Sequence, residues 1–130
     1  MTPEKQALAQ RRLERAREAI EEARLLFEAG HLHACVDRLC CACSYAISAL
    51  LLTRGLSMDM HILLLRAFLH REFVQPGMIP LEYERFIDLL FNNCQKSESS
   101  DFVVFQGEQV KGWLQQSREF VKCVSGLLAQ

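Results

Sequence analysis

The sequence predicts an all-α protein, an up-and-down antiparallel helical bundle with four long helices and a short fifth. Apolar residues recur at spacings of three and four in successive segments, and glycine, proline or polar residues separate these segments. Apart from a few residues around Phe102 to Phe105, no segment alternates with period two, so strands are not expected. The chain has 130 residues, half of them apolar, and we expect one domain, residues 1–130, around a continuous core.

The first expected helix begins at Thr2-Pro3, an N-cap candidate followed by proline at the first helical position. It stops near Gly30, where a C-terminal glycine is typical. Arginine and glutamate at helix-neighbour spacing cover its other faces, which indicates a solvated surface. The positions expected to face the core are Leu13, Ala16, Ile20, Ala23 and Phe27.

The second helix is expected from His31 to Arg54, because this segment lacks proline and glycine and Gly55 follows it. Its alanine, leucine and cysteine content indicates burial on more than one face. A third helix is expected to be capped by Ser57-Met58-Asp59 and to run to about Val74, before the turn Gln75-Pro76-Gly77.

The fourth helix is expected to open at Pro80 and to keep helical spacing as far as Phe91. The polar run from Asn92 to Asp101 is expected to be a loop, and its last six residues, KSESSD, are the best loop candidate in the chain. The last helix is expected from about Gly107 to Leu128. Its apolar stripe contains Val110, Trp113, Leu114, Val121, Val124 and Leu128.

Four of the six cysteines fall within the second expected helix, at Cys35, Cys40, Cys41 and Cys43. Successive helix residues are rotated by roughly 100°, so these thiols diverge and cannot converge on a metal unless another segment supplies half of the ligands. Cys40 and Cys43 are spaced as Cys-x-x-Cys, but Cβ atoms three apart on a helix are about 5 to 6 Å apart, too far for a disulfide. We therefore predict no metal, no cofactor and free thiols that fill helix–helix contacts.

The net charge of −1 and the absence of long like-charged blocks name no partner. We see no secretory signal, and the strongly apolar runs fall far short of the roughly 20 residues that span a bilayer. We therefore expect a cytoplasmic protein without a membrane segment, whose cysteines are reduced.

Asp37-Arg38 is a charged pair within an otherwise apolar helix, where unpaired charges are costly to bury. Two alternatives stay open at this point. The pair is either satisfied internally and by a neighbouring helix, or it lines a polar cleft. No glycine-rich phosphate loop or His-Glu-x-x-His motif accompanies it.

In their order and spacing, several stretches resemble the HEPN domain family, named for higher eukaryotes and prokaryotes nucleotide-binding. The similarity is to its small bacterial and archaeal single-domain subgroup. The stretches are Phe27 to Gly30, the second helix from Arg38 to Ser57, His61, FLHREFVQPG from Phe68 to Gly77, and DFVVF from Asp101 to Phe105.

This resemblance implies a helical bundle that dimerises and is often paired with a small nucleotidyltransferase, as in toxin–antitoxin systems. Many members are metal-independent ribonucleases, with an arginine followed by a histidine, or in this subgroup by Asp-Tyr. Here Cys94 stands where the arginine is expected, and Glu98-Ser99 where the acid and tyrosine are. Arg38 is retained, but Cys40 and Cys41 replace two tyrosines of the subgroup.

We therefore expect a catalytically weak or inactive HEPN-like module that acts through dimerisation and through a nucleotidyltransferase-type partner. Nucleotide or RNA is a further expected ligand, and the candidate binding residues are Asp37, Arg38, His61 and Lys96. Lys96 offers a positive charge but lacks the bidentate fork of arginine. The alternatives are an active ribonuclease toxin that uses Arg38, His61 and Lys96, a nucleotide-binding bundle, and a structural dimerisation module.

Overall fold

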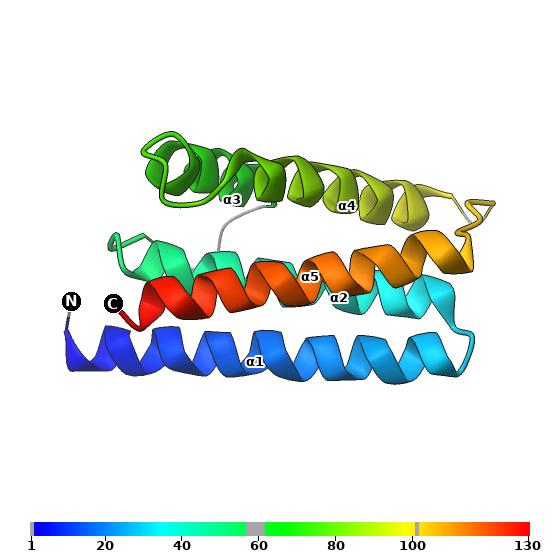
Figure 1. Cartoon of the computed structure of the whole chain (residues 1–130), viewed down its shortest axis with the longest axis horizontal. Helices are drawn as coiled ribbons and strands as arrows, with labels where there is room; N and C mark the ends of the chain where they lie inside the picture. The colour runs from blue at the N-terminus through cyan, green and yellow to red at the C-terminus, as the bar shows by residue number, and fades with distance from the viewer. Residues whose placement is uncertain (1, 57–61, 101) are drawn as a thin grey trace.

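The computed structural model describes residues 2–56, 62–100 and 102–130. Four long helices run along the long axis of the molecule, and each runs antiparallel to the long helix before it (Figure 1). Within the described ranges there is no strand, so the all-α prediction is confirmed. The elements are α1 (Pro3–Glu28), α2 (Leu32–Leu52), α3 (Ile62–Leu69), the π-helical turn η1 (His70–Val74), α4 (Leu81–Ser99) and α5 (Gly107–Leu128).

Helix α2 is the centre of the bundle. It packs against α1, α3, α4 and α5, whereas α1 contacts only α2 and α5 among the described elements (Figure 1). Its buried residues cover more than one face, as its composition indicated, and they include Val36, Leu39, Ile47 and Leu51.

The length and apolar composition of α2 also meet the requirement for crossing a membrane. The strongly apolar runs of α2 are short, but the alanines and cysteines between them raise the mean hydropathy of the whole helix. Counting uninterrupted runs alone was therefore too strict a criterion. In the bundle, 72% of the apolar window of α2 is buried. A core helix of this kind passes the same test, so the finding carries no further conclusion.

The predicted ends of the first two helices are confirmed within a few residues. Thr2 caps α1, since its Oγ1 accepts a hydrogen bond of 3.2 Å from the Lys5 amide. At the other end, the Gly30 amide donates to the Phe27 carbonyl at 3.0 Å and the His31 amide to the Leu26 carbonyl at 2.9 Å. This is a Schellman motif, and Gly30 supplies the required positive φ, +82°.

The predicted loop from Asn92 to Asp101 is wrong for most of its length, because α4 continues to Ser99. The helix persists because one of its faces is still in the core: Cys94 is only 4% exposed. Ser97 also contacts α2, with its Oγ 3.1 Å from His33 Nδ1. Asp101, like the predicted cap Ser57 to Asp59, lies outside the described residues.

Candidate functional site

A cavity of about 410 Å³ lies along α2 and α4, and α1 and α3 complete its wall. We call it the α2–α4 cavity. Most of the chemically distinctive side chains from the cysteine-rich part of α2 line it. The lining residues are Arg12, Asp37, Cys40, Cys41, Ser44, Tyr45, Ser48, Leu65, Cys94 and Glu98.

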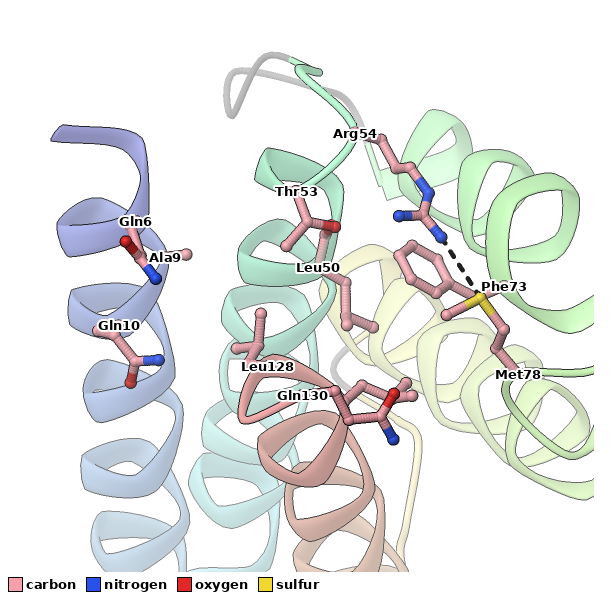
Figure 2. A pocket seen from close by; sticks show the side chains of 11 residues that line it. Gln6, Ala9, Gln10, Leu50, Thr53, Arg54, Phe73, Met78, Leu128 and Gln130 are labelled. Atoms are coloured by element: carbon pink, nitrogen blue, oxygen red, sulfur yellow. Dashed lines mark hydrogen bonds between the residues drawn. The ribbon is translucent and has the colours of Figure 1, made fainter. Parts of the chain in front are cut away.

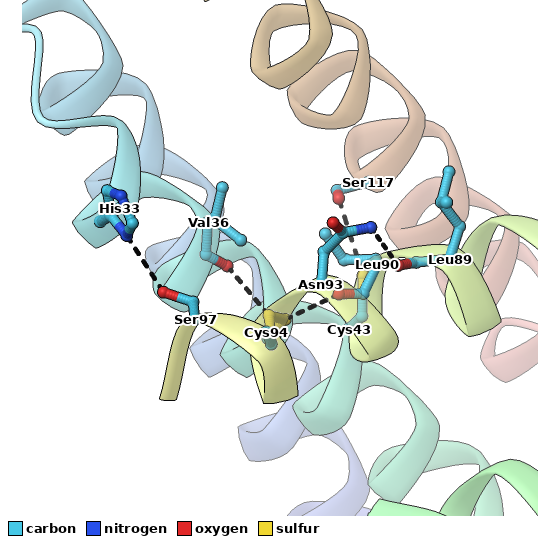
Figure 3. Close-up of a disulfide and its surroundings, with 10 residues drawn as sticks. His33, Val36, Cys43, Leu89, Leu90, Asn93, Cys94, Ser97 and Ser117 are labelled. Carbon is cyan, nitrogen blue, oxygen red and sulfur yellow. Dashed lines mark hydrogen bonds between the residues drawn. A yellow bond between two sulfur atoms is a disulfide. The ribbon is translucent and has the colours of Figure 1, made fainter. Parts of the chain in front are cut away.

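A disulfide in the wall of this cavity joins Cys40 of α2 to Cys94 of α4, and Figure 3 shows its surroundings. The Cα atoms are 6.8 Å apart, within the range of protein disulfides. The prediction that all six cysteines are thiols is therefore wrong for this pair. The sequence argument considered pairs within one helix, whereas this bond depends on how closely two helices approach.

Each sulfur of the disulfide also lies near a backbone oxygen of the opposite helix. The Leu90 carbonyl oxygen is 3.7 Å from Cys40 Sγ, and the Val36 carbonyl oxygen is 3.6 Å from Cys94 Sγ (Figure 3). After reduction, each thiol would have an acceptor in place for its S–H. Reduction would thus leave neither buried thiol without a partner.

The other buried cysteines of α2 behave as core residues, as predicted. Burial raises the pKa of Cys43 to about 12, and the nearby Ser117 hydroxyl, 3.7 Å from its sulfur, partly opposes this rise. Burial also raises the pKa of Cys35 to about 11. Because the thiolate is the nucleophile and the metal ligand, neither residue is suited to covalent or metal chemistry near neutral pH.

Asp37 and Arg38 have different environments, so each of the two alternatives for this pair holds for one residue. Arg38 reaches α1, where its Nη2 donates to Glu22 Oε1 at 3.1 Å. Its Nε is buried and has no hydrogen-bond partner in the described structure. Asp37 is exposed and lines the α2–α4 cavity.

The predicted binding residues do not form one cluster. Lys96 is exposed in the last turn of α4 and is not among the residues that line the cavity. His61 lies outside the described residues. Of the three candidates that the structure describes, Asp37 alone lies in the cavity wall.

Sequence reasoning missed Arg12, the cation that lines the cavity. Its Nε is buried and lacks a hydrogen-bond partner within the part of the chain that the structure describes. In the sequence, Arg12 looks like the other arginines on the solvated faces of α1. Its neighbour Arg15 instead packs on α2, with its guanidinium 4.9 Å from the Tyr45 ring centroid and its Nη2 3.0 Å from the Tyr45 hydroxyl.

The cavity coincides with the region where the family resemblance expects the ribonuclease motif, because Cys94 and Glu98 line it. Ser99 is exposed, and its hydroxyl donates to the Lys96 carbonyl at 3.1 Å. Among the described residues, no histidine lines the cavity and no group of three side chains is suited to a metal ion. The arrangement can donate and accept hydrogen bonds, but it lacks a paired nucleophile and base.

A second hollow, of about 280 Å³, lies where the ends of α1, α2 and α5 meet the segment after η1 (Figure 2). Arg54, the charged side chain among its described lining residues, contacts two neighbours. The guanidinium lies 4.7 Å from the Phe73 ring centroid, and Nη2 is 3.3 Å from Met78 Sδ. The three predicted binding residues that the structure describes, Asp37, Arg38 and Lys96, do not line this hollow.

Comparison with known proteins gave two matches and one negative result. The family model described as HEPN domain matches residues 9–127. A UPF0332 protein of Thermotoga maritima is 36% identical over 114 residues, which cover 88% of this chain and 86% of that protein. No solved structure matches.

Proposed function

Because the chain belongs to the HEPN domain family, we propose that it is a non-catalytic member that acts by association, as a homodimer and with a nucleotidyltransferase-type protein. One observation carries the proposal. The residue in place of the motif arginine is Cys94, which is nearly fully buried and bonded to Cys40. The position therefore presents a disulfide sulfur where cleavage would need a cation.

Cleavage of RNA without a metal requires a cation beside the phosphate and a group that moves a proton. Among the described residues that line the α2–α4 cavity, the single cation, Arg12, is accompanied by the carboxylates of Asp37 and Glu98. With both carboxylates ionised, the lining has a net negative charge, which repels a phosphodiester. This charge balance argues against the active ribonuclease alternative.

Exposed apolar side chains support a role in association. Leu64 of α3 is 51% exposed, and Leu81 and Leu89 of α4 are each 48% exposed. In the segment between α4 and α5, Phe102 is 91% exposed and Val104 is 76% exposed. Exposed apolar side chains that lie close together are typical of interaction surfaces. We propose that α3, α4 and this segment carry the dimer contact.

Light scattering coupled to size exclusion, together with an RNA cleavage assay, tests the proposal. We expect a particle of twice the 14.9 kDa chain mass and no RNA cleavage, with or without added metal. Leu89→Glu should shift the particle to the monomer, because it places a charge within the apolar contact. Gln109→Glu, at an exposed position in the first turn of α5, is the matched control.

A monomeric wild type that cleaves RNA would contradict the proposal and favour the ribonuclease toxin. For the partner, a tagged nucleotidyltransferase encoded beside the gene should co-elute with this chain, and separate elution would count against the toxin–antitoxin pairing. We also propose a cytoplasmic location, which fractionation would test.

Nucleotide or RNA binding at Asp37, Arg38, His61 or Lys96 is the second candidate function. A ligand that binds only the folded state raises the melting temperature, so a thermal shift with a nucleotide or an RNA oligonucleotide would support it. Arg38→Ala and Lys96→Ala should then remove the shift. An unchanged melting temperature would leave association as the preferred function.

A further inference from the structure

On a different side of the bundle, α1 and α5 lie against each other and enclose a shallow groove of about 270 Å³. We call it the α1–α5 groove. It shares no residue with the α2–α4 cavity. Its lining consists of Arg17, Ile20, Arg118, Val121, Lys122 and Ser125.

The groove has an apolar floor and a basic rim. Ile20 and Val121 are core residues, 8% and 4% exposed, and they form the floor. The three remaining long side chains, Arg17, Arg118 and Lys122, are all cations. A surface of this kind favours a ligand that is both apolar and negatively charged.

Within the described ranges, none of the three rim cations forms an ion pair with a carboxylate of the chain. Arg17 is held in place by a neutral group, because its Nη2 donates to Ser125 Oγ at 2.8 Å. The carboxylate of Glu21 lies near the rim, but Arg24 occupies it through hydrogen bonds to both of its oxygens. The bond from Arg24 is the main cause of the lowered pKa of Glu21, and the charge of Arg118 makes a smaller contribution. The rim is therefore available to external carboxylates.

The groove is elongated along α5. Arg118, Lys122 and Ser125 follow at spacings of four and three, so they lie on one face of that helix. Arg17 faces this row from α1, through its bond to Ser125. A ligand that meets all three cations and the floor must extend over about two helical turns.

Other anionic ligands fit less well. The lining contains no aromatic ring, whereas single-stranded nucleic acid depends on bases stacked on aromatic side chains. A free phosphate would engage the cations but make no apolar contact with the floor. A peptide with acidic and aliphatic side chains can use both parts of the groove.

We propose that the α1–α5 groove binds an acidic amphipathic segment of a protein partner. Its carboxylates pair with Arg17, Arg118 and Lys122, and an aliphatic side chain covers Ile20 and Val121. This inference rests on the proposed function, that the chain acts by association, and it adds a surface separate from the proposed dimer contact.

Fluorescence anisotropy with a labelled helical peptide of glutamate and leucine tests the inference, and the same peptide with lysine in place of glutamate is the control ligand. We expect the acidic peptide to bind, the basic peptide not to bind, and binding to weaken as salt is raised. Amide resonances of Ile20, Val121 and Ser125 should shift on titration, while those at the α2–α4 cavity stay unchanged.

The double variant Arg118→Glu with Lys122→Glu should bind the acidic peptide at least about tenfold more weakly, because two attractive pairs become repulsive. The matched control is Lys5→Glu with Lys111→Glu, which makes the same charge change at exposed positions outside the groove and outside the proposed dimer contact. It should bind nearly as well as the wild type. Equal weakening in both double variants would overturn the inference, since only net charge would then matter.

Binding of pyrophosphate or an RNA oligonucleotide at the groove, with no binding of the peptide, would also overturn the inference. The groove would then be a phosphate-binding site. Light scattering on the same samples separates this outcome from failure of the proposed function. If the protein is a dimer but does not bind the peptide, only the proposed role of the groove is contradicted. If the wild type is a monomer and cleaves RNA, the proposed function in association is itself contradicted.

Discussion

The α2–α4 cavity and the α1–α5 groove differ in how each surrounds its positive charge. In the cavity, Arg12 stands with Asp37 and Glu98, and a disulfide forms part of the wall. In the groove, three cations surround an apolar floor, and the described lining contains no carboxylate. The basic surface is thus not where the family resemblance expects RNA to be cleaved. The difference separates a covalently joined structural region from a surface suited to acidic partners.

The largest expected effect concerns the disulfide, which ties the cavity together. Cys40 and Cys94 are 54 residues apart, and closing a loop of this length stabilises a protein by about 4 kcal/mol in the chain-entropy model. Cys40→Ala should therefore lower the free energy of unfolding strongly in oxidising buffer. Urea titration followed by circular dichroism measures the loss.

Cys41→Ala is the matched control, because Cys41 lines the same cavity but is a free thiol. It should leave most of the stability in place. Under dithiothreitol, the wild type should lose the advantage conferred by the bond. Equal stability of the wild type in oxidising and reducing buffer would show that the bond does not constrain the unfolded chain.

The second expected effect concerns Cys43, on another face of α2, whose sulfur lies 3.7 Å from the Ser117 hydroxyl of α5. Burial raises the pKa of Cys43 in the folded protein to about 12, above its ordinary value. The folded state therefore keeps the proton while the unfolded thiol ionises. Its contribution to stability is intact below about pH 9 and decreases by about 1.4 kcal/mol per pH unit as the pH rises toward the folded pKa.

Unfolding free energies at several alkaline pH values test this effect. Cys43→Ala should make the decline above about pH 9 less steep than in the wild type, whatever its stability at neutral pH. Other groups also titrate in this range, so the difference between the two slopes is the decisive quantity. Parallel slopes would contradict the buried-thiol explanation.

The smallest effect concerns Arg38, which we expect to act in structure rather than in either hollow. Its pair with Glu22 joins α2 to α1 and is partly exposed, with side chains 35% and 56% accessible. A double-mutant cycle with Arg38→Ala and Glu22→Ala should give a coupling energy of about 0.5 kcal/mol. A coupling energy near zero, together with weaker nucleotide or RNA binding by Arg38→Ala, would show that Arg38 acts in binding and not in structure.

Much of the fold could be predicted because its signals are local. Thr2 and Pro3 begin α1, Gly30 ends it, and the last helix has the expected bounds. The continuation of α4 through the polar run to Ser99 could not be predicted in this way. A buried cysteine on one side of a polar stretch gives too weak a periodic signal, and only packing against α2 shows that the stretch remains helical.

The candidate sites were less predictable than the fold. The divergence of the cysteines around α2 concerns one helix only, so it could not show that Cys40 faces Cys94 of α4. Likewise, Arg12 and Arg17 are two of several arginines on α1 that local spacing assigns to solvent. One lines the cavity and the other the groove because different helices lie beside them.

The sequence by itself therefore determined the helical fold, the approximate ends of α1, α2 and α5, and the family, because capping, periodicity and motif order are encoded along the chain. Tertiary structure alone decided the disulfide, the partner of Arg38, and the two environments of the α1 arginines. Those features depend on distances between residues far apart in sequence. Such distances are set by how the faces of whole helices pack together.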